Sequence, residues 1–125
     1  MNGPQSVRTK KGAQNYAYGL WAEKFAELIL RIKGYQILGR RIKTPSGEID
    51  ILAATKKTLV VVEVKKRGDD FSAASAIRPA QQARLIASGS YMMGQVQGYE
   101  TVRFDAVLFA PKTLPKHIKN AFFAP

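Results

Sequence analysis

The chain has 125 residues, 46% of them hydrophobic, and its 20 Lys and Arg residues outnumber 9 Asp and Glu residues to give a formal net charge of +11. It contains no cysteine, which excludes disulfides, thiolate catalysis and cysteine-type zinc sites, and its apolar runs are too short to cross a membrane or act as a secretory leader, which predicts a cytoplasmic protein. A chain of this length can build a proper core, and so large a positive charge favours a polyanionic partner, above all nucleic acid.

The first elements along the chain are a tail and a helix. Residues 1–14 are polar and basic without periodicity, which predicts a flexible basic tail, and residues 15–125 then form a single domain. Between residues 15 and 33 apolar side chains recur at intervals of three and four, the spacing of an amphipathic helix, and Gly34 follows where such a helix ends. We expect its main apolar stripe to face the core; the members are Tyr18, Trp21, Ala22, Phe25, Leu28, Ile29 and Ile32.

The rest of the chain predicts four strands and two further helices. Strands are expected at 35–43, 48–54, 58–66 and 100–110, a second helix at 75–93, and a short terminal helix over 115–123. Because short links join the first three strands, they should form an antiparallel meander, and the second helix should carry the chain over to a strand parallel to the third. This order predicts an α/β fold with a mixed sheet flanked by helices.

The hairpin of the second and third strands carries an unusual polar group. Side chains alternate between the faces of a strand, and a turn centred between Lys56 and Lys57 places Asp50 directly opposite Glu63. One face of the hairpin is then wholly apolar, with Ile49, Ile51, Ala53, Val60, Val62 and Val64. The other face is apolar near the turn and polar at the open end, with Glu48, Asp50, Glu63 and Lys65.

Opposed carboxylates repel each other, so the pair formed by Asp50 and Glu63 requires compensation. A salt-bridge cluster with Lys65 and Glu48 is one solution, and a divalent cation is the other, since hard metals such as Mg²⁺ prefer carboxylate oxygens. The residues alone leave both open. Glu23 lies on a secondary row of the first helix with small neighbours, so it either faces something buried or is a solvated surface glutamate.

Asp50, a gap of twelve residues, and then Glu63-Val64-Lys65 on consecutive strands resemble the PD-(D/E)xK nuclease motif of the restriction-endonuclease-like superfamily. More closely, the chain resembles the YraN-like family of bacterial proteins, and the resemblance covers nearly everything after the tail. The segments that carry it include "GLWAEKFAELIL", "KGYQILGR", "GEIDILA", "LVVVEVKKR", "VRFDAVLF" and "HIKNAF".

The resemblance implies a restriction-endonuclease-like αβββαβ core and a metal-dependent endonuclease that hydrolyses phosphodiester bonds. It implies that Asp50, Glu63, the Val64 carbonyl and Glu23 hold Mg²⁺ or Mn²⁺, and that Lys65 is catalytic. Similarity to Holliday-junction resolvases implies a structure-selective enzyme acting on branched or junction DNA in DNA repair or recombination, and many such nucleases work as homodimers. The alternatives are a non-catalytic nucleic-acid-binding protein that keeps the nuclease fold, and an assembly subunit whose basic surface meets an acidic protein.

Several basic and polar residues are candidates for contacts to nucleic acid. They are Arg40, Arg41, Lys43, Lys66, Arg67, Arg78 and Arg84, with Gln82 added by the resemblance. Two positions depart from the family pattern: Arg41 stands where asparagine is usual, and Gln81 stands where lysine is usual. His117, the only histidine, is expected to be a partly packed residue of the terminal helix without a catalytic partner.

Overall fold

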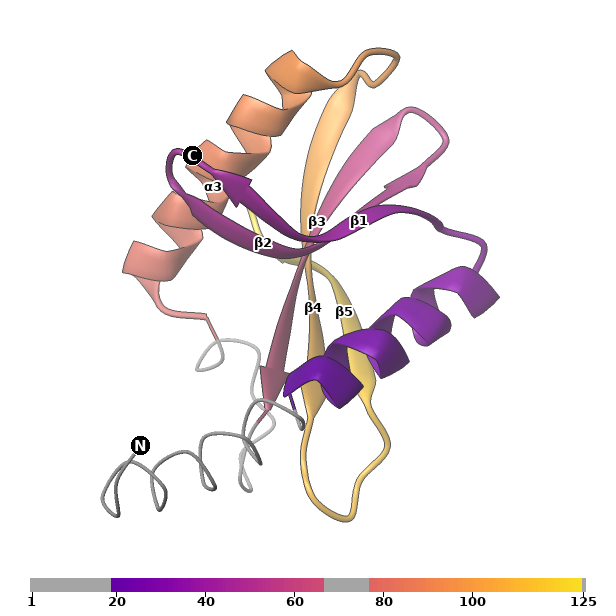
Figure 1. Cartoon of the computed structure of the whole chain (residues 1–125). Helices are drawn as coiled ribbons and strands as arrows, with labels where there is room; N and C mark the ends of the chain where they lie inside the picture. Colours follow the sequence, from indigo (N-terminus) through magenta and orange to yellow (C-terminus); the bar gives the residue numbers. More distant parts are fainter. Residues whose placement is uncertain (1–18, 67–76, 125) are drawn as a thin grey trace, which may run out of the picture.

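The computed structural model describes residues 19–66 and 77–124, which form two helices and five strands (Figure 1). The predicted tail, residues 15–18 and residues 75–76 lie outside these ranges. Residues 19–32 are helical and are called the first helix below. The other elements are β1 (Gln36–Thr44), β2 (Gly47–Thr55), β3 (Thr58–Lys66), α3 (Pro79–Gln95), β4 (Thr101–Phe109) and β5 (Lys116–Phe122).

The strands form one mixed sheet in the order β1-β2-β3-β4-β5. All neighbours are antiparallel except β3 and β4, which pair in parallel from Thr58 with Thr101 to Lys66 with Phe109, on either side of the α3 crossover. This arrangement confirms the predicted α/β fold, with an αβββαβ order flanked by helices. No helix in the described ranges is both long and apolar enough to cross a membrane.

The two helices cover opposite faces of the sheet. On the α3 face, Leu85 and Met92 of α3 belong to one buried cluster with strand residues such as Leu59 and Val61. On the first-helix face, the small side chains of the first helix belong to a second buried cluster, together with Val60, Val62 and Val64. Because side chains alternate along β3, Glu63 and Lys65 project on the α3 face, while their valine neighbours fill the other core.

The register of the central hairpin agrees with the prediction. Backbone partners run from Ile51 with Val62 to Thr55 with Thr58, across a turn in which Lys56 has a φ of 54°. One facial assignment was wrong: Ile49 lies in the cluster on the α3 face, whereas Ile51 lies in the other. Strict alternation is therefore lost around Asp50, beyond the last paired residues of the hairpin.

The predicted terminal helix was also wrong, because residues 116–122 form the edge strand β5. This strand pairs antiparallel with β4 and stacks the ring of Phe122 on that of Phe104, with centroids 5.0 Å apart. The spacing of the apolar residues fits a short helix as well as a strand. Pairing with the free edge of β4 decides for the strand, because it satisfies backbone groups that the edge would otherwise leave exposed.

The first helix presents a different side to the core than its main apolar stripe predicts. Ala22, Ala26 and Leu30 are fully buried, whereas Leu28 is 51% and Ile32 is 77% exposed. Small side chains on the inner row let the helix approach the sheet closely, so packing distance prevails over total hydrophobicity. At the outer margin, the larger rings form an aromatic group of Trp21, Phe25 and Phe109.

Candidate functional site

The structure brings Asp50, Glu63 and Lys65 together where β2 begins and β3 ends. The backbone amide of Val64 donates a 2.9 Å hydrogen bond to Oδ2 of Asp50, which fixes this carboxyl group beside β3. The ammonium of Lys65 lies 3.1 Å from Oε2 of Glu63, whose side chain is buried. The Glu63 carboxylate is close enough to Asp50 for its charge to act on the Asp50 carboxyl group. The sequence-predicted pair and its lysine therefore form one compact group.

The surroundings of the acid pair disfavour the charged form of Asp50. Burial, and then the charge of Glu63, raise the pKa of Asp50 from 3.8 to about 7. The Val64 amide and the Lys65 ammonium act in the opposite direction without cancelling the rise. The folded protein therefore favours the protonated form of Asp50 more than water does.

Gln81 is the residue of this site that sequence reasoning undervalued. Its side-chain amide, in the first turn of α3, donates a hydrogen bond to the same Glu63 oxygen that contacts Lys65. From the sequence it stood out only as a departure from the family pattern. Gln82 has another role, because its amide donates to the backbone carbonyl of Ile77 at 2.9 Å and so secures the start of the helix.

Glu23 does not join the acid pair. Both of its carboxylate oxygens accept hydrogen bonds from Arg41, at 2.9 Å and 3.4 Å, and it belongs to the helix on the opposite face of the sheet. Within residues 19–66 and 77–124, no three His, Asp or Glu side chains form a group that could hold a metal ion. The site therefore offers two carboxylates, with the third one kept in an ion pair.

The predicted phosphate-contacting residues differ in how free their charges are. Arg40 is paired with Glu27 at 3.0 Å, and Arg41 is paired with Glu23, so both charges are partly neutralised inside the protein. Lys43 lies opposite Glu48 in the β1–β2 register, and both residues are exposed. Arg67 lies outside the described residues. Lys66 is exposed at the end of β3. Arg78 lies just before α3, and Arg84 lies within α3.

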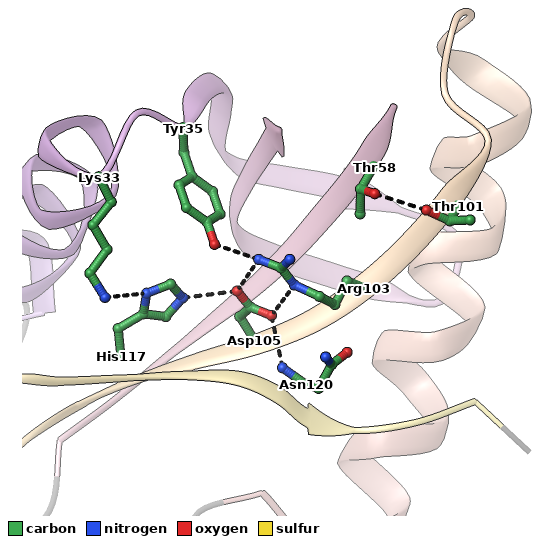
Figure 2. A network of polar contacts seen from close by, with 8 residues as sticks. All are labelled: Lys33, Tyr35, Thr58, Thr101, Arg103, Asp105, His117 and Asn120. Atoms are coloured by element: carbon green, nitrogen blue, oxygen red, sulfur yellow. Dashed lines mark hydrogen bonds and ion pairs between the residues drawn. The ribbon is translucent and has the colours of Figure 1, made fainter. Parts of the chain in front are cut away.

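A second polar cluster, centred on Asp105 of β4, was not predicted (Figure 2). Arg103 contacts both carboxylate oxygens of Asp105 at 2.9 Å and also reaches the hydroxyl of Tyr35. Nε2 of His117 lies 2.8 Å from the same carboxylate, and the amide of Asn120 donates to it at 3.1 Å. The only sequence signal was an aspartate inside an otherwise apolar strand that was expected to be buried.

Figure 2 shows this cluster linking β4, β5 and the end of the first helix. The ammonium of Lys33 lies 2.9 Å from Nδ1 of His117, and an ammonium can only donate, so Nδ1 accepts and Nε2 carries the proton given to Asp105. Burial raises the pKa of Asp105, but the hydrogen bonds from His117, Arg103 and Asn120 outweigh it and hold the pKa below its usual value. His117 is partly buried, as expected, but its ring is shielded from solvent in this cluster and belongs to β5 rather than to a terminal helix.

The fold and the site define a small α/β protein whose central strands carry an acidic pair with a neighbouring lysine. Within that class, the chain belongs to the family described as "Uncharacterised protein family UPF0102", whose model matches residues 22–109, and this bears out the YraN-like resemblance of its motifs. It is 42% identical over 113 residues to a UPF0102 protein of Parvibaculum lavamentivorans, covering 89% of this chain and 85% of the relative. It is 47% identical over 108 residues to one of Rhodopseudomonas palustris strain HaA2, covering 85% and 84% of the two chains.

Proposed function

We propose that the protein is a metal-dependent endonuclease that hydrolyses phosphodiester bonds in DNA. The observation that supports this most is the meeting of Asp50, Glu63 and Lys65 on neighbouring strands, which places two carboxyl groups beside one ammonium group. A purely structural salt bridge would leave the two carboxylates neutralised. Here burial, and then the charge of Glu63, raise the pKa of Asp50, and the Lys65 ammonium does not cancel the rise.

The donor set fits a hard divalent cation. Mg²⁺ and Mn²⁺ bind carboxylate oxygens and keep several waters, so two carboxylates suffice. Asp50 and Glu63 would hold the ion together with the Val64 carbonyl, and Glu23 would contribute only after leaving Arg41. When bound, such an ion polarises a phosphate and lowers the pKa of a bound water.

The protein's own side chains prepare the site for this chemistry. The Val64 amide holds Asp50 in place, and Gln81 holds Glu63, so neither carboxyl group has to be ordered when substrate arrives. Lys65, beside Glu63, stabilises the negative charge that develops on the phosphate during attack.

The charge of the chain supports DNA as the substrate. A net charge of +11 favours contacts to the phosphates of the DNA backbone. Such contacts do not depend on the base sequence of the DNA. No base-reading motif is visible, so the proposed enzyme selects branched or junction structure in DNA repair or recombination. We place it in the cytoplasm, and a homodimer would suit a two-fold junction.

Cleavage assays test this proposal directly. Linear duplex, single-stranded, flapped and four-way-junction DNA would be incubated with the protein and Mg²⁺ or Mn²⁺, and in parallel with EDTA. The variants Glu63→Gln and Lys65→Ala remove the acid and the cation of the site. Matched controls are Glu100→Gln and Lys57→Ala, which change exposed groups at the other end of β3.

Cleavage that requires a divalent cation, survives in both controls and disappears in both site variants would support the proposal. Binding to DNA without cleavage of any substrate would instead indicate a nucleic-acid-binding protein that retains the fold. Cleavage that persists in Glu63→Gln would point to a contaminating nuclease and would remove the basis of the proposal.

A further inference from the structure

A hollow beside the acid pair is lined by two arginines. It has a volume of about 430 Å³. Its border is formed by Arg78, which directly precedes α3, and by three residues of the first turns of α3, namely Ala80, Gln81 and Arg84. Arg78 and Arg84 are both exposed, and neither side chain forms an ion pair or hydrogen bond within the described part of the chain. Two guanidinium groups without an ion-pair partner among residues 19–66 and 77–124 thus border one concave surface.

The position of Arg84 is fixed by the turn between β1 and β2. Gly47 has a φ of 139°, and a side-chain carbon built on it would lie 3.2 Å from Cδ and 3.4 Å from Nε of Arg84. The stem of the arginine therefore packs over the bare backbone at the start of β2, three residues before Asp50. Glycine at this position both permits the backbone and leaves room for the arginine.

Gln81 connects the hollow with the acid pair. The same side chain lines the hollow and donates a hydrogen bond to Glu63. A negatively charged group bound in the hollow would therefore lie next to a group bound at Asp50 and Glu63. Both would be on the same face of the sheet.

We propose that this hollow is a phosphate subsite, which receives a backbone phosphodiester of DNA adjacent to the one held at the acid pair. The inference rests on the proposed function for its substrate, but it concerns binding rather than cleavage. Guanidinium groups present planar forks of N–H donors that match phosphate oxygens, and unpaired ones need not break an internal ion pair to bind. Arg40 and Arg41, which are already paired, contribute less.

The test measures DNA binding in EDTA, so that cleavage plays no part. Fluorescence anisotropy would be recorded over a range of salt concentrations, with a fluorescently labelled four-way DNA junction and with a labelled DNA single strand of about 20 nucleotides. We expect Arg84→Gln and Arg78→Gln each to weaken binding several-fold and to reduce the slope of log K against log salt by about 1. Arg84→Lys should fall between Arg84→Gln and the parent, since it keeps the charge but loses the fork.

The matched control is Lys24→Gln, which removes an exposed cation from the first helix on the other face of the sheet. Circular dichroism and thermal unfolding confirm that each variant is folded. If the arginine variants lose no more affinity than Lys24→Gln while the parent still cleaves DNA, the subsite is wrong and the proposed function stands. If the parent binds no DNA at all, both fall. Competition by inorganic phosphate tells a subsite for DNA from a site for small anions. If phosphate displaced DNA when both were present at equal concentrations, the proposal of a subsite for a DNA phosphodiester would be contradicted.

Discussion

The backbone amide of Val64 donates its hydrogen to the carboxylate of Asp50, just beyond the last backbone pair of β2 and β3, which is Ile51 with Val62. A side chain thus replaces the strand pairing that would otherwise continue. This contact holds Asp50 beside Glu63 although the two repel, and it satisfies an amide that the end of the pairing leaves without a backbone partner. The site therefore exists because the hairpin stops pairing at this point.

Replacing Asp50 by Asn should stabilise the metal-free protein at pH 8. The pKa of Asp50 is raised from 3.8 to about 7, so the folded state retains a proton that the unfolded state releases between these values. The free energy of unfolding of the parent therefore falls as the pH rises through about 7, whereas Asn carries no charge to repel Glu63. Urea denaturation in EDTA at pH 5 and pH 8 would show a decrease for the parent and a smaller one for Asp50→Asn. Glu48→Gln, an exposed neighbour on β2, is the control; a parent as stable at pH 8 as at pH 5 would contradict the raised pKa.

Gln81→Lys tests how far the neutral amide at this position sets the charge of the acid pair. An ammonium beside Glu63 should lower the pKa of Asp50, because it reduces the repulsion that helps to raise it. The pH at which the parent loses stability should then shift downwards, and the same titration by NMR of the Asp50 carboxyl carbon would show it. Ala83→Lys, an exposed position two residues along α3, adds the same charge elsewhere. An equal shift in this control would mean that the charge acts at long range rather than at Glu63.

The hairpin could be predicted from the sequence because its signals are local. Alternation of apolar residues and the length of the turn fix which residues face each other, and the observed partners Ile51 and Val62 follow from them. The same reasoning failed one step later, at Ile49, where Asp50 leaves the regular pairing and the alternation of faces is lost. Local patterns describe a strand well only as long as it remains paired.

The remaining errors concern contacts between segments that are far apart in the chain. Residues 116–122 are a strand because β4 offers them an edge, and this is invisible in their own spacing. The cluster around Asp105 joins residues from three elements, and no local pattern connects Tyr35 with His117. The assignment of Glu23 to the metal site, which came from the resemblance, stays a prediction; in the structure Glu23 is paired with Arg41.

Arg41 occupies a backbone conformation that suits asparagine better than arginine. Its φ is 53°, in the left-handed region that asparagine tolerates and branched residues avoid. We expect Arg41→Asn to lose the ion pair with Glu23 but to regain part of that loss from the backbone, leaving stability within about 1 kcal/mol of the parent. Arg41→Val loses the ion pair and adds strain, so it should be less stable than Arg41→Asn by about 1–2 kcal/mol. Chemical denaturation of the two variants gives the comparison, and equal stabilities would show that the backbone relaxes at this position.

Asp105→Asn should be the most destabilising of these changes. The carboxylate is fully buried and accepts hydrogen bonds from Arg103, His117 and the Asn120 amide, so its neutral replacement leaves Arg103 as a poorly compensated charge. Breaking a buried pair of this kind costs about 3–5 kcal/mol. Since the pKa of Asp105 is lowered, its contribution is present above the unfolded value of 3.8 and is lost as the pH falls through the folded one.

Acid titration separates this contribution from that of Asp50, whose raised pKa acts in the opposite direction. Between pH 5 and pH 2, the parent should lose stability steeply and Asp105→Asn less so, because the variant has no carboxylate to protonate there. Thr101→Val, an exposed change at the start of β4, serves as the matched control. If the stability of the variant depended on acid pH in the same way as that of the parent, the ionised Asp105 carboxylate would not contribute to holding β4, β5 and the end of the first helix together.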